Sequence, residues 1–270
     1  MKHLHTLLLF LSLLFPSLAT AQCELENTAF NAGEVLSYNL YYNWKFVWVK
    51  VGTGTLSTEM SRYENKEAIK CSLITRGNGK LDKFFIMRDT LTSYITPKLV
   101  PLYFRKGAEE GKKYTVDEVW YSYSGSQCSV RLHRLHKNGD QRWSNEKKNE
   151  CIYDMLNIFL RARSYKTEGW TKGKTLQFPI ADGKNVTTGQ LKFEGKENVK
   201  GDDNVKYKCL RFSYTEWDKK KNKYKEFGRL YVTDDANHVP VRIDLTLNMG
   251  IAKAFLTKTK GLRNTTSSKI

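Results

Sequence analysis

Apolar residues at alternate positions between residues 36 and 48 constrain the fold of this chain more than any other feature. Side chains alternate across a β-strand, so residues at every second position share one face. At ~3.3 Å per residue such a segment would extend about 40 Å, longer than a typical strand. It is therefore either one strongly curved strand or two strands with a turn near Asn43-Trp44-Lys45, and both predict a large bent sheet. The apolar positions are Leu36, Tyr38, Leu40, Tyr42, Trp44, Phe46 and Trp48.

A second alternation, from Val239 to Leu247, places apolar residues on one face and polar residues on the other. This pattern is typical of an antiparallel sheet with one buried face. Weaker strand patterns lie between the two alternations, separated by turn sequences such as Gly77-Asn78-Gly79 and Asp182-Gly183. These weaker strands are predicted at residues 67–76, 84–95, 112–123, 127–136, 174–180, 186–194, 205–217 and 227–233.

Residues 151–165 carry the clearest helical pattern, because apolar residues from Ile152 to Leu160 recur at helical spacing. Asn149-Glu150 offers a cap and an acidic first turn. The predicted fold class is mainly β: a large curved antiparallel sheet, half-barrel or barrel-like, with two similar halves as one possible form and one central α-helix against its inner face. We predict a single β-rich domain over residues 22–263 and a flexible C-terminal tail over residues 264–270.

The N-terminus has the three parts of a secretory signal peptide: basic Lys2, an apolar run from Leu7 to Leu18, and the small-x-small sequence Ala19-Thr20-Ala21. The run is shorter than the ~20 residues of a transmembrane helix. We therefore predict a signal peptide over residues 1–21, secretion across the inner membrane and a periplasmic mature chain without a transmembrane segment. Lipid attachment at Cys23 is the less favoured alternative, because Gln22 occupies the position that requires a small residue.

The net charge is +17 for the whole chain and +16 without Lys2, the charged residue of the signal. Such basicity favours acidic partners or surfaces, and export argues against nucleic acid as the partner. The segment from Asp218 to Lys223 reads as an exposed hairpin tip, and a solvated loop is the ordinary interpretation. The alternative is contact with an anionic surface through Lys219, Lys220, Lys221 and Lys223.

Five cysteines lie beyond the signal, and an oxidising compartment permits disulfides between them. Their number is odd and their spacing fits no compact framework, so one bridge with free buried thiols and no bridge both remain open.

No motif for a catalytic nucleophile or a nucleotide is present. His133 and His136 would lie on opposite faces of a strand, which argues against a metal site. We therefore predict no enzymatic activity and no cofactor, and rank a hydrolase of envelope polymers last. Asp89-Thr90-Leu91 resembles a bacterial O-glycosylation site, which makes Thr90 a candidate for modification.

Four short segments follow one another along the chain: Phe30 to Tyr38, Gly52 to Leu56, Asp154 to Arg161, and Val232 to Arg242 followed by Gly250 and Leu256. In this order they resemble the exported bacterial family called domain of unknown function 3108. Ala32 stands where the family's opening motif favours proline. The resemblance implies an envelope location and a β architecture, but no activity, because the function of the family is not established.

Our leading hypothesis is a non-enzymatic envelope protein that binds an amphipathic small molecule, such as a lipid, or a glycan. The ligand would lie on a concave sheet face lined by Tyr38, Tyr42, Trp44, Phe46 and Trp48. The ordinary interpretation of these side chains is that they pack on the helix as core. The alternative function is a structural or assembly factor that contacts other envelope proteins.

Overall fold

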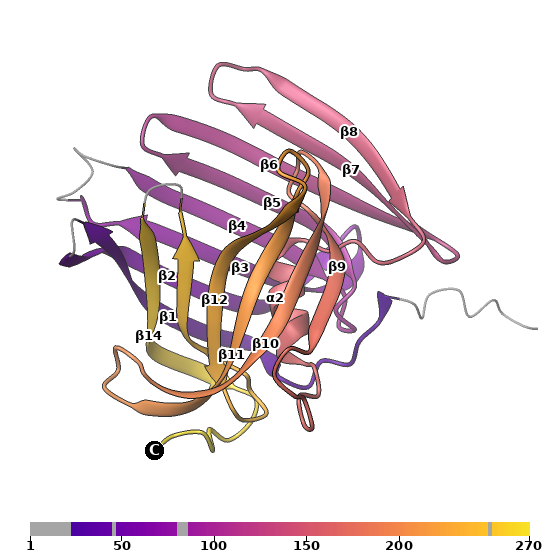
Figure 1. The fold of residues 1–270 in the computed structure, drawn as a ribbon. Coiled ribbons are helices and arrows are strands. Elements are labelled where there is room, and N and C mark those ends of the chain that lie inside the picture. Colours follow the sequence, from indigo (N-terminus) through magenta and orange to yellow (C-terminus); the bar gives the residue numbers. More distant parts are fainter. Residues whose placement is uncertain (1–22, 45–46, 80–85, 248–249) are drawn as a thin grey trace, which may run out of the picture.

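The computed structural model describes residues 23–44, 47–79, 86–247 and 250–270 (Figure 1). In this part of the chain, fourteen strands form one antiparallel sheet with the order β8-β7-β6-β5-β4-β3-β2-β1-β14-β13-β12-β11-β10-β9. The strands are β1 (Phe30–Trp44), β2 (Val47–Tyr63), β3 (Lys66–Gly77), β4 (Met87–Ile95), β5 (Pro101–Glu110), β6 (Lys113–Ser124), β7 (Gln127–His136), β8 (Gln141–Lys148), β9 (Thr175–Ala181), β10 (Val186–Lys200), β11 (Lys206–Asp218), β12 (Lys223–Thr233), β13 (Pro240–Thr246) and β14 (Ile251–Leu262).

The sheet is curved and does not close, because β8 and β9 remain at its two ends. The first strand, β1, pairs with both β2 and the last strand, β14, and so joins two consecutive meanders. The helix α2 (Met155–Arg163) lies between them, with the magenta strands behind it and the orange strands in front (Figure 1). The predicted fold class, a large curved antiparallel sheet with one central helix, is confirmed for the described residues.

The apolar alternation at residues 36–48 is divided by a turn, so the second of the two alternatives is correct. β1 ends at Trp44 and β2 begins at Val47. In the register of this hairpin Val49 pairs with Tyr42 and Trp48 pairs with Asn43. Directly paired residues share a face, so Trp48 and Tyr42 lie on opposite faces of the sheet. Phe46 and the side chain of Trp44 lie outside the described part.

The predicted weaker strands correspond to β3, β4, β6, β7 and β9 to β12, with ends that differ by a few residues. Four observed strands were not among the predicted ranges: β2, β5, β8 and β14. The edge strand β8 shows why: six of its eight residues are exposed and none is buried, so it has no apolar face to produce an alternation.

The helix begins at Met155, four residues later than predicted, and its cap is Asp154 rather than Asn149-Glu150. The Asp154 carboxylate accepts a hydrogen bond of 2.8 Å from the backbone N–H of Asn157. Residues before the cap are extended: the Tyr153 N–H donates to the carbonyl of Pro179 at 3.0 Å and forms a parallel bridge to β9. Cys151, Ile152 and Tyr153 are buried although they are not helical. Their apolar character therefore extended the predicted helix beyond its true start.

Two buried polar contacts fix the helix to the first meander. At its start, Ser93 of β4 donates to the Asp154 carboxylate at 3.0 Å. At its end, the Arg163 guanidinium donates two hydrogen bonds to the Glu34 carboxylate of β1, at 2.6 and 2.9 Å. Buried polar groups need such partners, so these pairs define one position for the helix.

The helix contributes side chains to two apolar clusters. Leu156 and Leu160 pack with residues of the first meander, including Leu36 and Leu91. Ile158 packs on the other side, against β9 to β12. A helix with apolar residues on two sides is expected when a sheet curls around it.

Three of the five cysteines, Cys71, Cys128 and Cys209, are buried free thiols, and Cys23 forms a disulfide with Cys151. Of the two alternatives, one bridge with free buried thiols is the one observed. The Cys23 sulfur is thereby engaged in the bridge, which argues against lipid attachment at this residue.

The C-terminal segment 264–270, which we expected to be a flexible tail, is anchored to the sheet. The Lys208 N–H donates to the Ser268 carbonyl at 2.8 Å, and the Ile270 N–H donates to the Lys206 carbonyl at 2.9 Å. The Ser268 side chain is buried and donates to Asp235 at 2.7 Å. The polar composition of this segment did not reveal these backbone contacts, because they depend on the position of β11.

Replacing Asp154 by asparagine is expected to change how stability depends on pH. Burial raises the pKa of Asp154 to about 6, although hydrogen bonds from Asn157 and Ser93 oppose the shift. Because the folded-state pKa lies above the unfolded value, wild-type stability should fall as the pH rises from about 4 to about 6. Asparagine caps a helix as well as aspartate but does not ionise.

The variant should therefore gain about 2–3 kcal/mol relative to wild type between about pH 4 and pH 7.5. Urea denaturation at the two pH values measures this difference, with Asp140→Asn at an exposed turn position as the control. An Asp154→Asn stability difference that is independent of pH would contradict the assignment.

Candidate ligand-binding site

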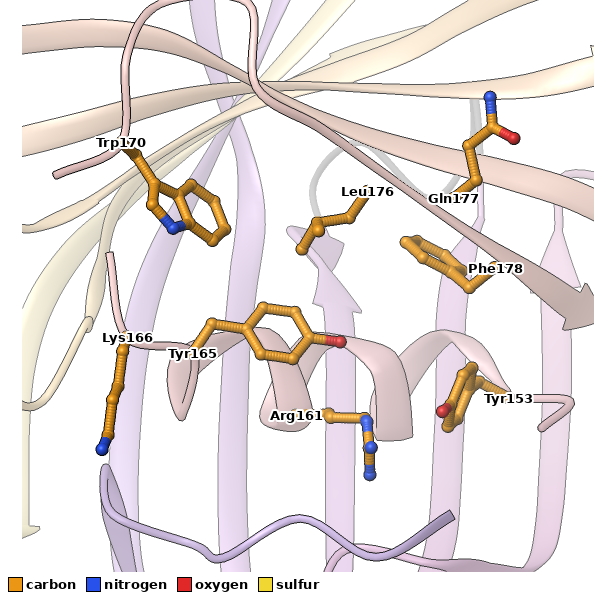
Figure 2. A pocket seen from close by; sticks show the side chains of 8 residues that line it. All are labelled: Tyr153, Arg161, Tyr165, Lys166, Trp170, Leu176, Gln177 and Phe178. Atoms are coloured by element: carbon orange, nitrogen blue, oxygen red, sulfur yellow. The ribbon is translucent and has the colours of Figure 1, made fainter. Parts of the chain in front are cut away.

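A pocket of about 270 Å³ lies between the helix α2 and strand β9 (Figure 2). Figure 2 shows Leu176 and Phe178 above the helix and Tyr165 and Arg161 along it. Four aromatic side chains and two cations line this space. Its lining residues are Tyr153, Arg161, Tyr165, Lys166, Trp170, Leu176, Gln177 and Phe178.

Local structure places each wall of the pocket. The bridge between Tyr153 and Ile180 sets the Tyr153 ring beside β9, where its centroid lies 6.3 Å from that of Phe178. Arg161 and Tyr165 are four residues apart, so they follow one another along the same side of the helix end. Trp170 comes from the next loop and contacts Phe193 and Phe212 edge-on.

Arg161 is the unusual member of this group, because it is a buried cation without an acidic partner. Its side chain donates to the Cys23 carbonyl at 2.7 Å, and the guanidinium carbon lies 5.2 Å from the Tyr153 ring centroid. The residue is 8% exposed. Among the described residues, no carboxylate lies within 4.0 Å of it. A buried charge is ordinarily paired, so the site is electrostatically suited to an anion.

The two tyrosines of the pocket remain neutral hydrogen-bonding groups. Burial raises the pKa of Tyr153 to about 12 and raises the pKa of Tyr165, while the Arg161 charge opposes both shifts. Their hydroxyl groups can therefore donate to a bound ligand at neutral pH. The lining offers a ligand four aromatic rings, two phenol hydroxyl groups, one amide and two cations.

The residues of the predicted aromatic face are not brought together at this pocket. Tyr38 is buried in the core, and its hydroxyl donates to the Pro240 carbonyl at 3.1 Å. Tyr42 is half-buried, with its hydroxyl close to Gly250. Trp48 is 39% exposed on the opposite face, and the Lys253 ammonium lies 4.1 Å from its ring centroid. The single lining that we inferred from alternation is therefore divided between core and surface.

Lys219, Lys220, Lys221 and Lys223 lie at the exposed tip between β11 and β12, as the sequence indicates. The Asp218 carboxylate accepts from the backbone N–H groups of Lys220 and Lys221, so it shapes the turn. Contact of this tip with an anionic surface stays a prediction.

Thr90 lies in the middle of β4, paired with Ile74 and Gly107 on its two sides, and is half-buried. Its modification also stays a prediction.

The pocket residues were not selected from the sequence, although several belong to the predicted helical segment. Arg161 was interpreted as a cation near the end of a helix, which is an ordinary helix-capping feature. Trp170 and Phe178 belong to a loop and a strand that meet the helix only after folding. The sequence indicated this site only through Arg161, a basic residue between apolar ones near the helix end. Such a residue is equally typical of a ligand site and of an ordinary helix C-terminus.

A row of rings from β2, β4, β5, β6 and β8 was also missed. Successive ring centroids from Tyr63 through Tyr103 and Trp120 to Trp143 lie 5.5–5.7 Å apart. Tyr94 joins the row between β2 and β5. Its neighbour Ser93 contacts the helix cap, so the row lies on the face away from the helix. Each strand contributes one ring, and no local pattern reveals the set.

The sequence profile of the family described as "Protein of unknown function (DUF3108)" matches residues 37–257. The resemblance found in the short segments is thereby confirmed. No curated protein is matched by the chain. Among the described residues, no helix has both the length and the apolar composition that crossing a membrane requires.

Solved structures that are similar to this one include the following two. A β-barrel-like protein of the domain of unknown function DUF1849 from Brucella abortus is 10% identical, with 87% of this chain and 100% of that chain covered and a TM-score of 0.53. A putative exported protein with a YmcC-like fold from Bacteroides fragilis is 9% identical, with coverages of 88% and 100% and a TM-score of 0.36. The first likeness supports the barrel-like fold and nothing further.

Proposed function

This chain belongs to the DUF3108 family of proteins of unknown function, and from that premise we propose that it is a non-enzymatic binding protein of the bacterial periplasm whose pocket at α2 holds an amphipathic anion. The observation that carries the proposal is Arg161, a buried guanidinium without a carboxylate partner among the described residues, at the wall of an aromatic pocket. A phosphate or carboxylate head group would supply the missing negative charge.

The rest of the pocket suits the apolar part of such a ligand. Tyr153, Trp170 and Phe178 offer aromatic surface, while Lys166 is exposed at the entrance and Gln177 adds polar hydrogen-bonding groups. The volume of about 270 Å³ is slightly below the ~300 Å³ at which sites for drug-sized ligands begin, so the pocket fits a head group and a short chain. A long acyl chain would have to continue outside it.

Titration with octyl phosphate and octyl glucoside, both below their micelle concentrations, tests the proposal because the two share a tail and differ in the head group. Isothermal titration calorimetry should show binding of octyl phosphate and little binding of octyl glucoside. A charged hydrogen bond contributes about 1.5–3 kcal/mol, so Arg161→Gln should weaken octyl phosphate binding at least tenfold. Lys166→Gln should have a smaller effect, because that lysine is exposed.

Arg62→Gln is the matched control, since Arg62 also donates to a backbone carbonyl, that of Asn65 at 2.9 Å, but on the surface. It should leave affinity unchanged. Tighter binding of octyl glucoside would favour the glycan alternative over an anion. Equal affinities of wild type and Arg161→Gln for octyl phosphate, with both proteins folded by circular dichroism, would remove Arg161 from the site.

A further inference from the structure

Exposed apolar side chains are concentrated where β2, β12, β13 and β14 approach their hairpin turns, along one side of the middle of the sheet. Of fourteen large apolar residues that are exposed in the described part, seven lie there, on three hairpins that are neighbours in the sheet. Such a patch is uncommon on a soluble protein surface and marks an interaction site. We call it the apolar rim, and it consists of Val47, Trp48, Val49, Phe227, Leu245, Leu247 and Ile251.

Strand pairing establishes that these residues form one continuous rim. The start of β2 pairs with the end of β1, whose Tyr42 pairs with Ala252 at the start of β14. Ala252 in turn pairs with Leu245 at the end of β13, and Leu245 pairs with Gly228 of β12. Hairpin ends far apart in the sequence are therefore adjacent in the sheet.

The rim exposes apolar side chains on both faces of the sheet. Val49 and Leu245 share the face of Tyr42, because all three are linked through direct pairs. Trp48 and Ile251 point to the opposite face. Trp48 precedes Val49, and Ile251 precedes Ala252, which pairs with both Tyr42 and Leu245. Their exposed fractions are 37% for Val49, 45% for Leu245, 39% for Trp48 and 43% for Ile251. A partner that packs on one face would leave half of these side chains in water, whereas shallow insertion into a bilayer interface would bury both sets.

Lysines surround the rim. The Lys253 ammonium lies 4.1 Å from the Trp48 ring centroid, and the Lys225 ammonium lies 5.2 Å from the Phe227 ring centroid. Pairs of an aromatic ring and a basic side chain are characteristic of the membrane–water interface. The β11–β12 tip carries Lys219, Lys220, Lys221 and Lys223. It lies on the same side as the rim, because Gly228, a few residues after the tip, pairs with Leu245 at the end of β13.

We propose that the apolar rim docks on the surface of a membrane that contains anionic phospholipids. The apolar side chains enter the boundary between head groups and acyl chains, and the lysines meet the head-group phosphates. This inference goes beyond the pocket at α2 and does not depend on it, because no rim residue lines that pocket.

Vesicle flotation tests the proposal with vesicles of phosphatidylglycerol and phosphatidylcholine in equal amounts, and with vesicles of phosphatidylcholine alone. Wild type should float with the anionic vesicles and bind the neutral ones at least tenfold more weakly. Each lysine near an anionic surface increases the membrane affinity about fivefold. Leu247→Ser combined with Ile251→Ser should reduce binding to anionic vesicles about tenfold or more. Both residues are exposed, so the fold should tolerate their replacement.

The matched control is Met60→Ser combined with Ile270→Ser, which removes two exposed apolar side chains away from the rim. It should float like wild type. Absence of wild-type flotation, or equal losses in the rim variant and the control, would overturn the proposal. Octyl phosphate binding by the rim variant and vesicle binding by Arg161→Gln should both stay at wild-type levels, so a failure of the rim can be distinguished from a failure of the pocket.

Discussion

Replacing Glu34 by glutamine is expected to destabilise the protein by about 3–5 kcal/mol, because it leaves a buried guanidinium without a counter-charge. The side chains of Glu34 and Arg163 are 1% and 2% exposed, and two hydrogen bonds of 2.6 and 2.9 Å join them. After the substitution Arg163 would retain a neutral amide and the Asn237 carbonyl, which now accepts from its Nε at 3.1 Å. Water cannot reach the site to solvate the charge.

The loss is large compared with the ~5–15 kcal/mol that stabilises an ordinary domain, so it should be evident in guanidinium denaturation. Glu59→Gln is the matched control, since Glu59 pairs with Lys70 at 2.8 Å on the surface with 61% of its side chain exposed. Removing that pair should cost less than about 1 kcal/mol. Similar losses in the two variants would show that Arg163 is not a buried charge.

A double variant separates the cost of an unpaired charge from the contribution of the pair itself. Glu34→Leu combined with Arg163→Met removes both charges and fills a similar volume. Because replacing a buried ion pair by apolar residues is often neutral or stabilising, the double variant should be more stable than Glu34→Gln. A double variant less stable than Glu34→Gln would indicate that the pair stabilises the fold mainly by its geometry, through the helix end that it holds against β1.

Removing the disulfide between Cys23 and Cys151 is expected to destabilise the protein by about 2–5 kcal/mol. The bridge joins residues 128 positions apart, so in the unfolded chain it closes a very long loop and restricts many conformations. In the folded chain it ties the N-terminal segment to the residues before the helix. The Cys23 carbonyl there accepts the Arg161 hydrogen bond, so the bridge also supports the pocket.

Guanidinium denaturation of Cys23→Ser combined with Cys151→Ser measures the loss, and reductant provides an independent check. Wild type in reductant should match the double variant, and the double variant should not respond to reductant. Burial raises the pKa of Cys209 to about 12 and also raises those of Cys71 and Cys128, which keeps these thiols protonated and unreactive. An unfolding midpoint that is unchanged by both treatments would contradict a stabilising bridge.

The sequence predicted the fold class because that class depends on local patterns. The alternation from Val239 to Leu247 predicted a strand, which became β13, although Leu245 and Leu247 at its end are exposed. The edge strand β8 was missed because its exposed residues show no period. The helix was found but started too early, since Ile152 and Tyr153 are buried for a different reason: they extend beside β9.

The candidate site was beyond local patterns altogether. Arg161 and Arg163 are two residues apart in one helix and are both buried, yet one pairs with Glu34 and the other has no carboxylate neighbour in the described part. Nothing in the sequence around them distinguishes these two environments. The difference arises because the curled sheet places β1 beside one guanidinium and an aromatic pocket beside the other.

Residue patterns alone predict a curved antiparallel sheet around one helix, because burial on one face imposes a period of two on strands and of 3.6 on helices. The tertiary structure decided which aromatic rings are core and which are exposed, since the turn between β1 and β2 reverses the strand and moves Trp48 to the other face. It also decided where charge is left unpaired. The unpaired charge depends on contacts between residues more than a hundred positions apart, such as Arg161 and Cys23, and no local pattern carries that information.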